Sequence, residues 1–305
     1  MRLAVVGTGG VGAYFGGRLA RAGADVHFVA RGEHLAALRE RGLRVRSIRG
    51  DFELPVDATD DPAEIGPCDL VLFCVKSFDT ETAAAALPSL LRSETGVLSL
   101  QNGVDNEEKL GTAIGQNRVL GGAAYILVWI AEPGVIEHVA GPGSIAFGEL
   151  DGTHSERAEL LLEWCGRADI PAKLDSNVRA RLWDKFAFIC AQAGMTAATR
   201  LPIGEIRTNP ESWAMFRRIS EEVVALADAE GVRLAPDTVE RHVGFAEGLE
   251  PEGTSSLYHD LVHGRRLELE ALHGLVVSRA RKHGLAVPTC EAVYALLAPW
   301  AARNA

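Results

Sequence analysis

The chain opens with a short apolar run, residues 3–6, that ends in a glycine-rich turn. The glycines have the spacing Gly-x-Gly-x-x-Gly, and a helical pattern of apolar residues follows at once over residues 11–22. In a strand–turn–helix unit the first glycine permits a tight turn, the second lets the backbone approach a pyrophosphate, and the third lets the helix pack on the strand. The anion then lies at a helix N-terminus, where free N–H groups favour negative charge. The pattern predicts a dinucleotide-binding turn formed by Gly7, Thr8, Gly9, Gly10, Val11 and Gly12. An ordinary strand–helix turn is the alternative.

Strand and helix patterns alternate along the first half of the chain. Residues 69–76 form a continuous apolar run, which is typical of a parallel strand buried on both faces. Alternating residues around Gly50 predict an antiparallel hairpin, residues 44–48 with 52–56. The other expected strands are 25–31, 96–100, 119–130, 135–139, 144–147 and 171–174, and the expected helices are 34–40, 79–91 and 156–167. This order predicts an α/β fold with a Rossmann-type doubly wound sheet, an NADP-binding domain of residues 1–175.

The second half of the chain is helical throughout. Helical periodicity runs over residues 179–199, 211–230, 236–247 and 260–283, with almost no strand signal. We therefore expect an all-helical domain at residues 176–305 that carries substrate and catalytic groups. Ligands of open α/β sheets bind at the carboxyl ends of the strands, so we expect the ligand cleft there, between the two domains.

Charge and cysteine content exclude several classes of protein. The formal net charge of −10 argues against a nucleic-acid binder, which needs basic patches facing phosphate. The five cysteines are scattered and odd in number, as expected of a reduced cytoplasmic protein rather than a disulfide scaffold or a zinc site. No apolar run approaches the roughly 20 residues that span a bilayer, so no membrane association is expected.

Two basic residues at strand ends bear on the choice of dinucleotide. The second strand ends in Arg31, where NAD-binding folds commonly place an acidic residue for the ribose hydroxyl. A guanidinium matches a 2′-phosphate bidentately, which favours NADP(H). Lys76, at the end of the 69–76 strand, would add a second positive charge. The alternative for each residue is a solvated strand-end cation.

Two polar residues are candidates for contact with substrate and cofactor. Asn102 follows the 96–100 strand and can both donate and accept hydrogen bonds, although Asn-Gly is also a common turn pair. Lys185 shares a helix face with apolar Leu182, Phe188 and Ile189. Desolvation on such a face lowers a lysine pKa and favours proton transfer. A lysine whose amine reaches solvent is the alternative.

The expected helix 260–283 carries a third candidate, Glu268. We place it on an apolar stripe with Leu261, Gly264, Leu272 and Leu275, where it could orient Lys185 or accept a substrate hydroxyl. An ion pair with Arg265 is the alternative. His259 and His263 have the i, i+4 spacing of metal ligands, but no further ligand supports them and we expect no metal.

Taken together, these residues resemble the ketopantoate reductase (2-dehydropantoate 2-reductase) family over nearly the whole chain. The matching pieces are Gly7 to Gly12, Arg31, Val75-Lys76, Gln101-Asn102-Gly103, Trp183-Asp184-Lys185, Ser255-Ser256, residues 264–268 and residues 283–288. The resemblance implies NADPH-dependent reduction of a 2-oxo acid to a 2-hydroxy acid, in ketopantoate reductases a step of pantothenate biosynthesis. It implies Lys185 as proton donor, Glu268 on substrate or ribose hydroxyls, Ser256 on the substrate carboxylate, and Asn102 with Lys76 beside the cofactor.

The chain departs from the family pattern in the helical half. The family has asparagines four and eight residues after the lysine and a polar residue before a Gly-Glu pair, where this chain has Ile189, Ala193 and Ile203. Sites built for a substrate hydroxyl depend on such groups, so discrimination between substrates should change. Gln192 or Thr196 could compensate.

Three functions remain open from the sequence. Ketopantoate reduction is the first, and a family reductase acting on a more apolar 2-oxo acid or another carbonyl is the second. The third is a non-catalytic NADP(H)-binding regulator, against which the presence of Lys185 and Glu268 argues. The apolar faces of the carboxy-terminal helices fit either a homodimer contact or the domain's own core.

Overall fold

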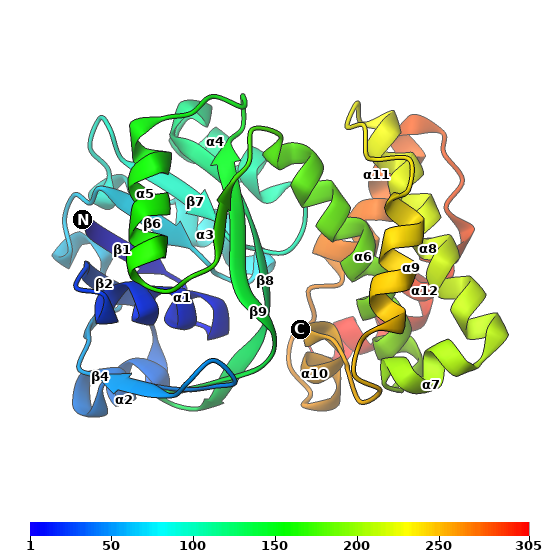
Figure 1. Ribbon diagram of the computed structural model, residues 1–305, viewed down its shortest axis with the longest axis horizontal. Coiled ribbons are helices and arrows are strands. Elements are labelled where there is room, and N and C mark those ends of the chain that lie inside the picture. Colours follow the sequence, from blue (N-terminus) through cyan, green and yellow to red (C-terminus); the bar gives the residue numbers. More distant parts are fainter. Residues whose placement is uncertain (305) are drawn as a thin grey trace. The chain divides into compact units, whose positions relative to one another are not determined.

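The computed structural model describes residues 1–304, which form two compact units (Figure 1). The first unit consists of Met1–Gln101 and Asp105–Val178, and the second of Asn102–Val104 and the chain from Arg179 onward. The three-residue loop Asn102–Val104 thus groups with the second unit, although the chain on either side of it belongs to the first. Within residues 1–304, no helix combines the length and the apolar character that crossing a membrane requires.

The first unit is built on one sheet with the strand order β4-β3-β9-β8-β7-β6-β1-β2-β5, and β10 pairs with β9. The strands from β8 through β7, β6, β1 and β2 to β5 pair in parallel, whereas β8 and β9 are antiparallel. The bounds are Arg2–Val6 (β1), Asp25–Val29 (β2), Leu43–Ser47 (β3), Phe52–Leu54 (β4), Asp57–Thr59 (β5), Leu70–Phe73 (β6), Gly96–Ser99 (β7), Val119–Glu132 (β8), Val135–Glu149 (β9) and Ala172–Leu174 (β10). The predicted Rossmann-type α/β sheet followed by helices is confirmed.

Both faces of the central strands are buried, as the continuous apolar runs predict. Side chains alternate along β1, so Leu3 and Val5 join one core with Phe15, while Ala4 and Val6 join the other. Helices cover the sheet (Figure 1), with bounds Gly10–Arg21 (α1), Gly32–Arg41 (α2), Thr80–Ala84 (α3), Asn106–Ile114 (α4) and Glu156–Arg167 (α5). This packing places the start of α1 directly after β1, where the glycine-rich turn lies.

Two expected elements of this unit are wrong in detail. The predicted helix 79–91 is broken into α3 and a separate 3₁₀ turn at Leu87–Leu90, because Pro88 has no N–H to continue a helical ladder. The predicted strands 135–139 and 144–147 are one strand, β9, whose pairing with β8 shifts register near Tyr125. The predicted hairpin is confirmed as β3 with β4, and β3 also pairs in parallel with β9.

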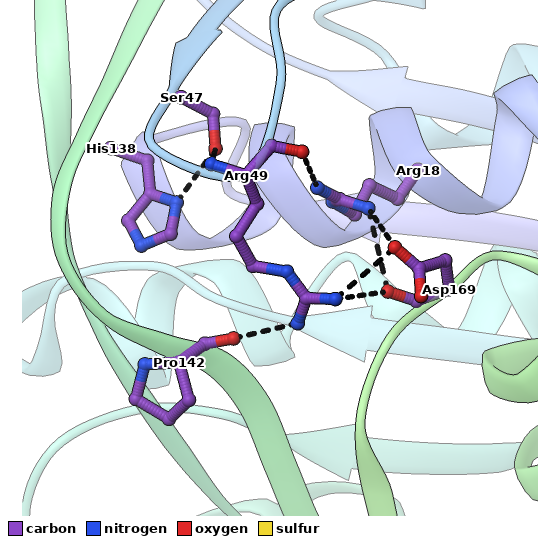
Figure 2. A network of polar contacts seen from close by, with 6 residues as sticks. All are labelled: Arg18, Ser47, Arg49, His138, Pro142 and Asp169. Carbon is purple, nitrogen blue, oxygen red and sulfur yellow. Dashed lines mark hydrogen bonds and ion pairs between the residues drawn. The ribbon is translucent and has the colours of Figure 1, made fainter.

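A polar network ties the β3–β4 hairpin to α1 and β9 (Figure 2). Arg49 in the hairpin turn forms an ion pair with Asp169 at 3.1 Å. Arg18 of α1, only 5% exposed, donates to the Arg49 carbonyl at 3.2 Å and also pairs with Asp169. Ser47 Oγ lies 2.9 Å from Nδ1 of His138 in β9. Through Arg18, these contacts hold the carboxyl-terminal part of α1 against the hairpin turn and Asp169.

The second unit is helical among its described residues. Its helices are Val178–Thr199 (α6, which begins at the last residue of the first unit), Ile203–Thr208 (α7), Pro210–Ala229 (α8), Thr238–Glu247 (α9), Ser256–Val262 (α10), Leu275–His283 (α11) and Pro288–Arg303 (α12). A π-helical turn, Glu270–Gly274, leads into α11. Sequence analysis did not predict α12, although Pro288 occupies its first turn, where proline is favoured.

The predicted continuous helix 260–283 is wrong. The chain leaves the helix after Val262, and Gly264 adopts φ +64°, a left-handed conformation that favours glycine. The Arg265 N–H donates to the Asp260 carbonyl and the Gly264 N–H to the Leu261 carbonyl, which closes a Schellman motif. The stripe that was expected to carry Glu268 therefore does not exist as one helix face.

The π-helical turn holds a fully buried histidine, His273. Its side chain is 0% exposed, and burial lowers the pKa of the ring to about 4 from the usual 6.5. The unfolded chain takes up this proton between pH 6.5 and pH 4 and the folded chain does not. His273 should therefore contribute a loss of stability as the pH drops through that window, of roughly 3 kcal/mol at its lower end.

Urea denaturation of the wild type and of His273→Leu at a series of pH values checks this expectation. The variant lacks the titrating ring, so the difference between its unfolding midpoint and that of the wild type should shift in favour of the variant as the pH falls from 6.5 to 4. Burial raises the pKa of Glu107 in the first unit to about 7, so this carboxyl stabilises the fold as the pH falls. Its effect is opposite to that of His273 and is present in both proteins, so only the comparison between them isolates the histidine. An equal pH dependence in both proteins would show that His273 does not titrate as described.

Candidate active site

The glycine-rich turn between β1 and α1 has three glycines that the fold itself requires. Gly7 has φ +95°, and a Cβ there would lie 2.5 Å from the Val75 backbone nitrogen. A Cβ on Gly12 would collide with the Gly7 carbonyl oxygen and lie 2.9 Å from a methyl of Val5. A Cβ on Gly10 would lie 2.7 Å from the Val128 carbonyl oxygen of β8. Close packing of turn, helix and strands therefore accounts for these three positions.

Gly9 differs from the other three glycines. A Cβ on Gly9 would meet no atom within 4 Å, and its φ of −80° is open to any residue. The first helical bond of α1 runs from the Ala13 N–H to the Gly9 carbonyl, so the N–H groups of Gly10, Val11 and Gly12 precede it. An open position beside unbonded helix N–H groups fits the phosphates of a dinucleotide.

Thr8 has a structural role in this turn. Its hydroxyl donates to the Val29 carbonyl at 2.8 Å and its N–H donates to the same oxygen at 3.2 Å. The side chain is 4% exposed. Both donors of Thr8 are therefore used to hold the turn against β2, and a cofactor contact from either would require breaking one of these bonds.

The two predicted cofactor cations lie at corresponding places in the sheet. Arg31 follows β2 and is the N-cap of α2, and Lys76 follows β6 and is the N-cap of a 3₁₀ turn. Both residues are exposed. Each thus stands just beyond the carboxyl end of a parallel strand, where dinucleotides bind in folds of this kind.

Sequence analysis missed a buried polar network at the carboxyl ends of β6 and β7. The Gln101 amide donates to the Thr80 hydroxyl at 2.7 Å and to the Val75 carbonyl at 3.1 Å. Ser99 and Asn106 extend the network on either side. The polar residues at the end of a buried strand were the sequence signal from which this network could have been predicted. The network holds the chain immediately before Asn102.

Lys185 and Asn102 meet in the second unit. Lys185 Nζ donates to Asn102 Oδ1 at 3.0 Å, and both side chains are half-buried. Lys185 lies on α6, and Asn102 lies in the short loop after β7, 83 positions earlier in the chain. Gly103 beside it has φ +108°, which supports the Asn-Gly turn geometry. Two residues that the sequence singled out separately thus form one hydrogen-bonded pair.

The other predicted residues of this unit lie near the start and end of α10. Glu268 follows the break after α10 and is 8% exposed, so it is buried although the predicted helix is absent. Ser256 is the first residue of α10, and its neighbour Ser255 caps the helix by accepting from the Tyr258 N–H at 3.1 Å. The roles expected of Ser256 and Glu268 stay predictions.

The two residues that could have compensated for the lost asparagines are used within the fold. Gln192 donates to the Thr254 carbonyl at 3.2 Å, and Thr196 Oγ1 lies 2.8 Å from Ser255 Oγ. Both contacts fasten the entry of α10 to α6. Ile189 is half-buried and Ala193 is buried, so this part of α6 stays apolar.

His259 and His263 do not face a common ion. His259 Nε2 lies 3.1 Å from the Thr254 hydroxyl, and His263 Nδ1 lies 2.7 Å from the His259 carbonyl. Among residues 1–304, no group of three or more His, Cys, Asp or Glu side chains is arranged to hold a metal ion.

The sheet with its glycine turn defines a Rossmann-like α/β domain, and a helical domain follows it. Two family profiles match the chain, "Ketopantoate reductase PanE/ApbA" over residues 3–152 and "Ketopantoate reductase PanE/ApbA C terminal" over residues 177–300. The chain belongs to the ketopantoate reductase family. Members of this family include 2-dehydropantoate 2-reductases, oxidoreductases that act on a CH–OH group.

Individual relatives agree with this membership. The 2-dehydropantoate 2-reductase of Halobacterium salinarum is 35% identical over 94% of this chain and 95% of its own. The crystal structure of a PanE/ApbA family ketopantoate reductase from Ralstonia eutropha has a TM-score of 0.91 at 36% identity, covering 100% of this chain and 99% of that one. D-mandelate dehydrogenase, in a ternary structure with NADH and anilino(oxo)acetate, shares the fold with a TM-score of 0.91 at 21% identity, covering 100% of this chain and 99% of that one.

Proposed function

We propose that this protein reduces a 2-oxo acid to a 2-hydroxy acid with NADPH, and that ketopantoate, reduced to pantoate, is its substrate. The observation that carries the proposal is the bond from Lys185 Nζ to Asn102 Oδ1, which directs an ammonium at the loop after a strand of the dinucleotide-binding sheet. The family membership and the relatives named 2-dehydropantoate 2-reductase support the choice of substrate.

The residues of the chain supply what ketone reduction needs besides hydride. A bound reduced nicotinamide is the hydride source. Negative charge develops on the ketone oxygen, and the Lys185 ammonium stabilises that charge and donates the proton. The bond to Asn102 Oδ1 fixes the direction of the ammonium. We assign Glu268 to substrate or ribose hydroxyls and Ser256 to the substrate carboxylate.

We propose NADP(H) as the dinucleotide. The N–H groups of Gly10, Val11 and Gly12 would bind the pyrophosphate, with Gly9 leaving room for it. The exposed guanidinium of Arg31 would pair with the 2′-phosphate, and Lys76 would add positive charge close by. NADH is the competing cofactor, because it is the one bound in the D-mandelate dehydrogenase structures.

Arg31→Ala should separate the two cofactors. Charge-assisted hydrogen bonds contribute about 1.5–3 kcal/mol each, so the variant should bind NADPH about 10–100-fold more weakly. NADH lacks the 2′-phosphate, and its affinity should change little. Fluorescence titration of each reduced dinucleotide measures both constants, with Arg41→Ala, an exposed arginine at the other end of α2, as the matched control. Equal losses for NADPH and NADH would remove the argument for the phosphate.

A second candidate substrate is a more apolar 2-oxo acid. It is favoured by Ile189 and Ala193 on α6 and by the engagement of Gln192 and Thr196 in the fold. A panel of 2-oxo acids assayed for NADPH oxidation distinguishes the candidates. A higher kcat/KM for ketopantoate supports the first, and turnover of only apolar acids supports the second. Tight NADPH binding without turnover of any carbonyl would instead indicate a non-catalytic regulator.

We further propose a cytoplasmic enzyme that forms a homodimer. All five cysteines are free thiols, and four of them are buried, which suits a reducing compartment. The dimer is expected from the apolar faces of the carboxy-terminal helices alone. Sedimentation of the purified protein over a range of concentrations tests it, and a species of monomer mass throughout would contradict it.

A further inference from the structure

Asp184, the residue directly before Lys185 on α6, is bound by two side chains of α9. Arg241 Nη2 donates to Asp184 Oδ1 at 3.0 Å, and His242 Nε2 lies 3.4 Å from the same oxygen. Burial opposes ionisation of Asp184, but His242 and Arg241 outweigh it and hold the pKa of its carboxyl below the usual value. Asp184 therefore stays a carboxylate that joins α6 to α9.

Ser220 of α8 fixes the orientation of the His242 ring. Its hydroxyl lies 2.9 Å from His242 Nδ1. Ser220 is 0% exposed and His242 is 5% exposed, so water does not compete for this bond. The other ring nitrogen, Nε2, is the one that faces Asp184. The chain of contacts thus runs from α8 through α9 to α6.

Aromatic packing supports the same face of α6. Phe188 lies one turn after Asp184, and its ring is T-shaped to that of His242 at 5.7 Å and to that of Phe245 at 5.2 Å. Phe216 of α8 lies 6.3 Å away on the other side. Polar and aromatic contacts therefore resist rotation of α6 about its axis at the turn that carries Lys185.

We propose that Asp184, His242 and Ser220 are positioning residues, which fix the rotation of α6 and so hold the Lys185 ammonium on Asn102. This inference rests on the proposed role of Lys185 as proton donor. Successive residues of a helix are about 100° apart, so a side chain anchored at Asp184 sets the direction of Lys185 without touching it. A displacement of about 1 Å at the reacting atoms can cost about 10²-fold in rate.

The test compares Asp184→Ala with Asp184→Asn. Both α9 contacts reach Oδ1, an oxygen that asparagine keeps and alanine removes. D184A should lower kcat about 10–100-fold with KM changed less than about threefold, and D184N should stay within about threefold of wild type. A kcat of D184A close to that of wild type would overturn the proposal. An equal fall of kcat in D184N would also overturn it, because the result would show that the charge of Asp184, and not its contact with α9, supports turnover.

Glu240→Ala provides the matched control. Arg217 and Glu240 form a bidentate pair between α8 and α9, at 2.7 and 2.6 Å, without contacting α6. Breaking it should leave kcat and KM unchanged. A fall in kcat equal to that of D184A would show that any α8–α9 contact matters and would contradict a specific anchor. Thermal denaturation of each variant establishes that it is folded.

A readout independent of turnover separates this inference from the proposed function. Acetylation of Lys185 by trace acetic anhydride, measured by peptide mass spectrometry, reports how firmly the amine is held. The exposed Lys173 of the first unit is the internal standard. D184A should raise the relative labelling of Lys185 several-fold and D184N should not. Unchanged labelling in D184A overturns the inference, whereas full activity of Lys185→Ala would overturn only the assignment of Lys185 as the proton donor.

Discussion

Lys185→Ala should lower kcat by about 10²–10⁴-fold while leaving the dissociation constant of NADPH unchanged. The amine donates to Asn102 at 3.0 Å and belongs to α6 of the helical unit, whereas the glycine turn that is proposed to bind the phosphates belongs to the sheet unit. Removing it takes away both the charge that stabilises the developing oxyanion and the proton that completes the alcohol. Steady-state assays with saturating NADPH and a fluorescence titration of the dinucleotide measure the two quantities.

Lys185→Arg and Lys282→Ala are the controls for this prediction. Arginine keeps the positive charge but does not release its proton, so the variant should also be slow if proton donation is essential. Lys282 is an exposed lysine of α11, and its removal should leave kcat unchanged. If Lys185→Ala keeps most of its activity, the assigned proton donor is wrong.

Gly9→Val should weaken dinucleotide binding roughly a hundredfold in a protein that still folds. No atom lies within 4 Å of the position a Cβ would take, and the backbone conformation suits any residue. The added side chain would occupy the space proposed for the pyrophosphate. Loss of two charge-assisted hydrogen bonds, at about 1.5 kcal/mol each, weakens binding roughly a hundredfold. Titration with NADPH and circular dichroism measure binding and folding on the same sample.

Gly12→Ala, in contrast, should lower the stability of the fold. Its methyl group would collide with the Gly7 carbonyl, so the variant should be destabilised by about 1–3 kcal/mol. The comparison separates a glycine that the fold requires from one that the ligand requires. If Gly9→Val binds NADPH as the wild type does, the phosphates do not lie at this turn.

The sheet unit was largely predictable because its signals are local. A continuous apolar strand, a glycine turn and a helical period each come from neighbouring residues, and β1, α1 and β6 follow from them. The candidate residues Asn102 and Lys185 could be named from their places at a strand end and on a helix. Their bond could not be predicted, because 83 positions separate them.

Other features of the fold and of the candidate site could not be predicted, because local residue patterns do not reveal which of several contacts a residue makes in the folded chain. The apolar period through residues 260–283 predicted one helix, but the left-handed conformation of Gly264 ended it. Polar groups of α6 such as Gln192 looked available for substrate, yet the entry of α10 uses them. The buried network around Gln101 was missed because its members come from separate segments.

Transfer of a labelled hydride tests the central claim most directly. The purified protein is incubated with ketopantoate and NADPH that carries deuterium at the transferring position of the nicotinamide, and the products are analysed by mass spectrometry. The account predicts pantoate with one deuterium on the carbinol carbon, formed at a rate that Lys185→Ala nearly eliminates. Absence of a deuterated 2-hydroxy acid from ketopantoate and from every other 2-oxo acid tested, with NADPH bound, would contradict it.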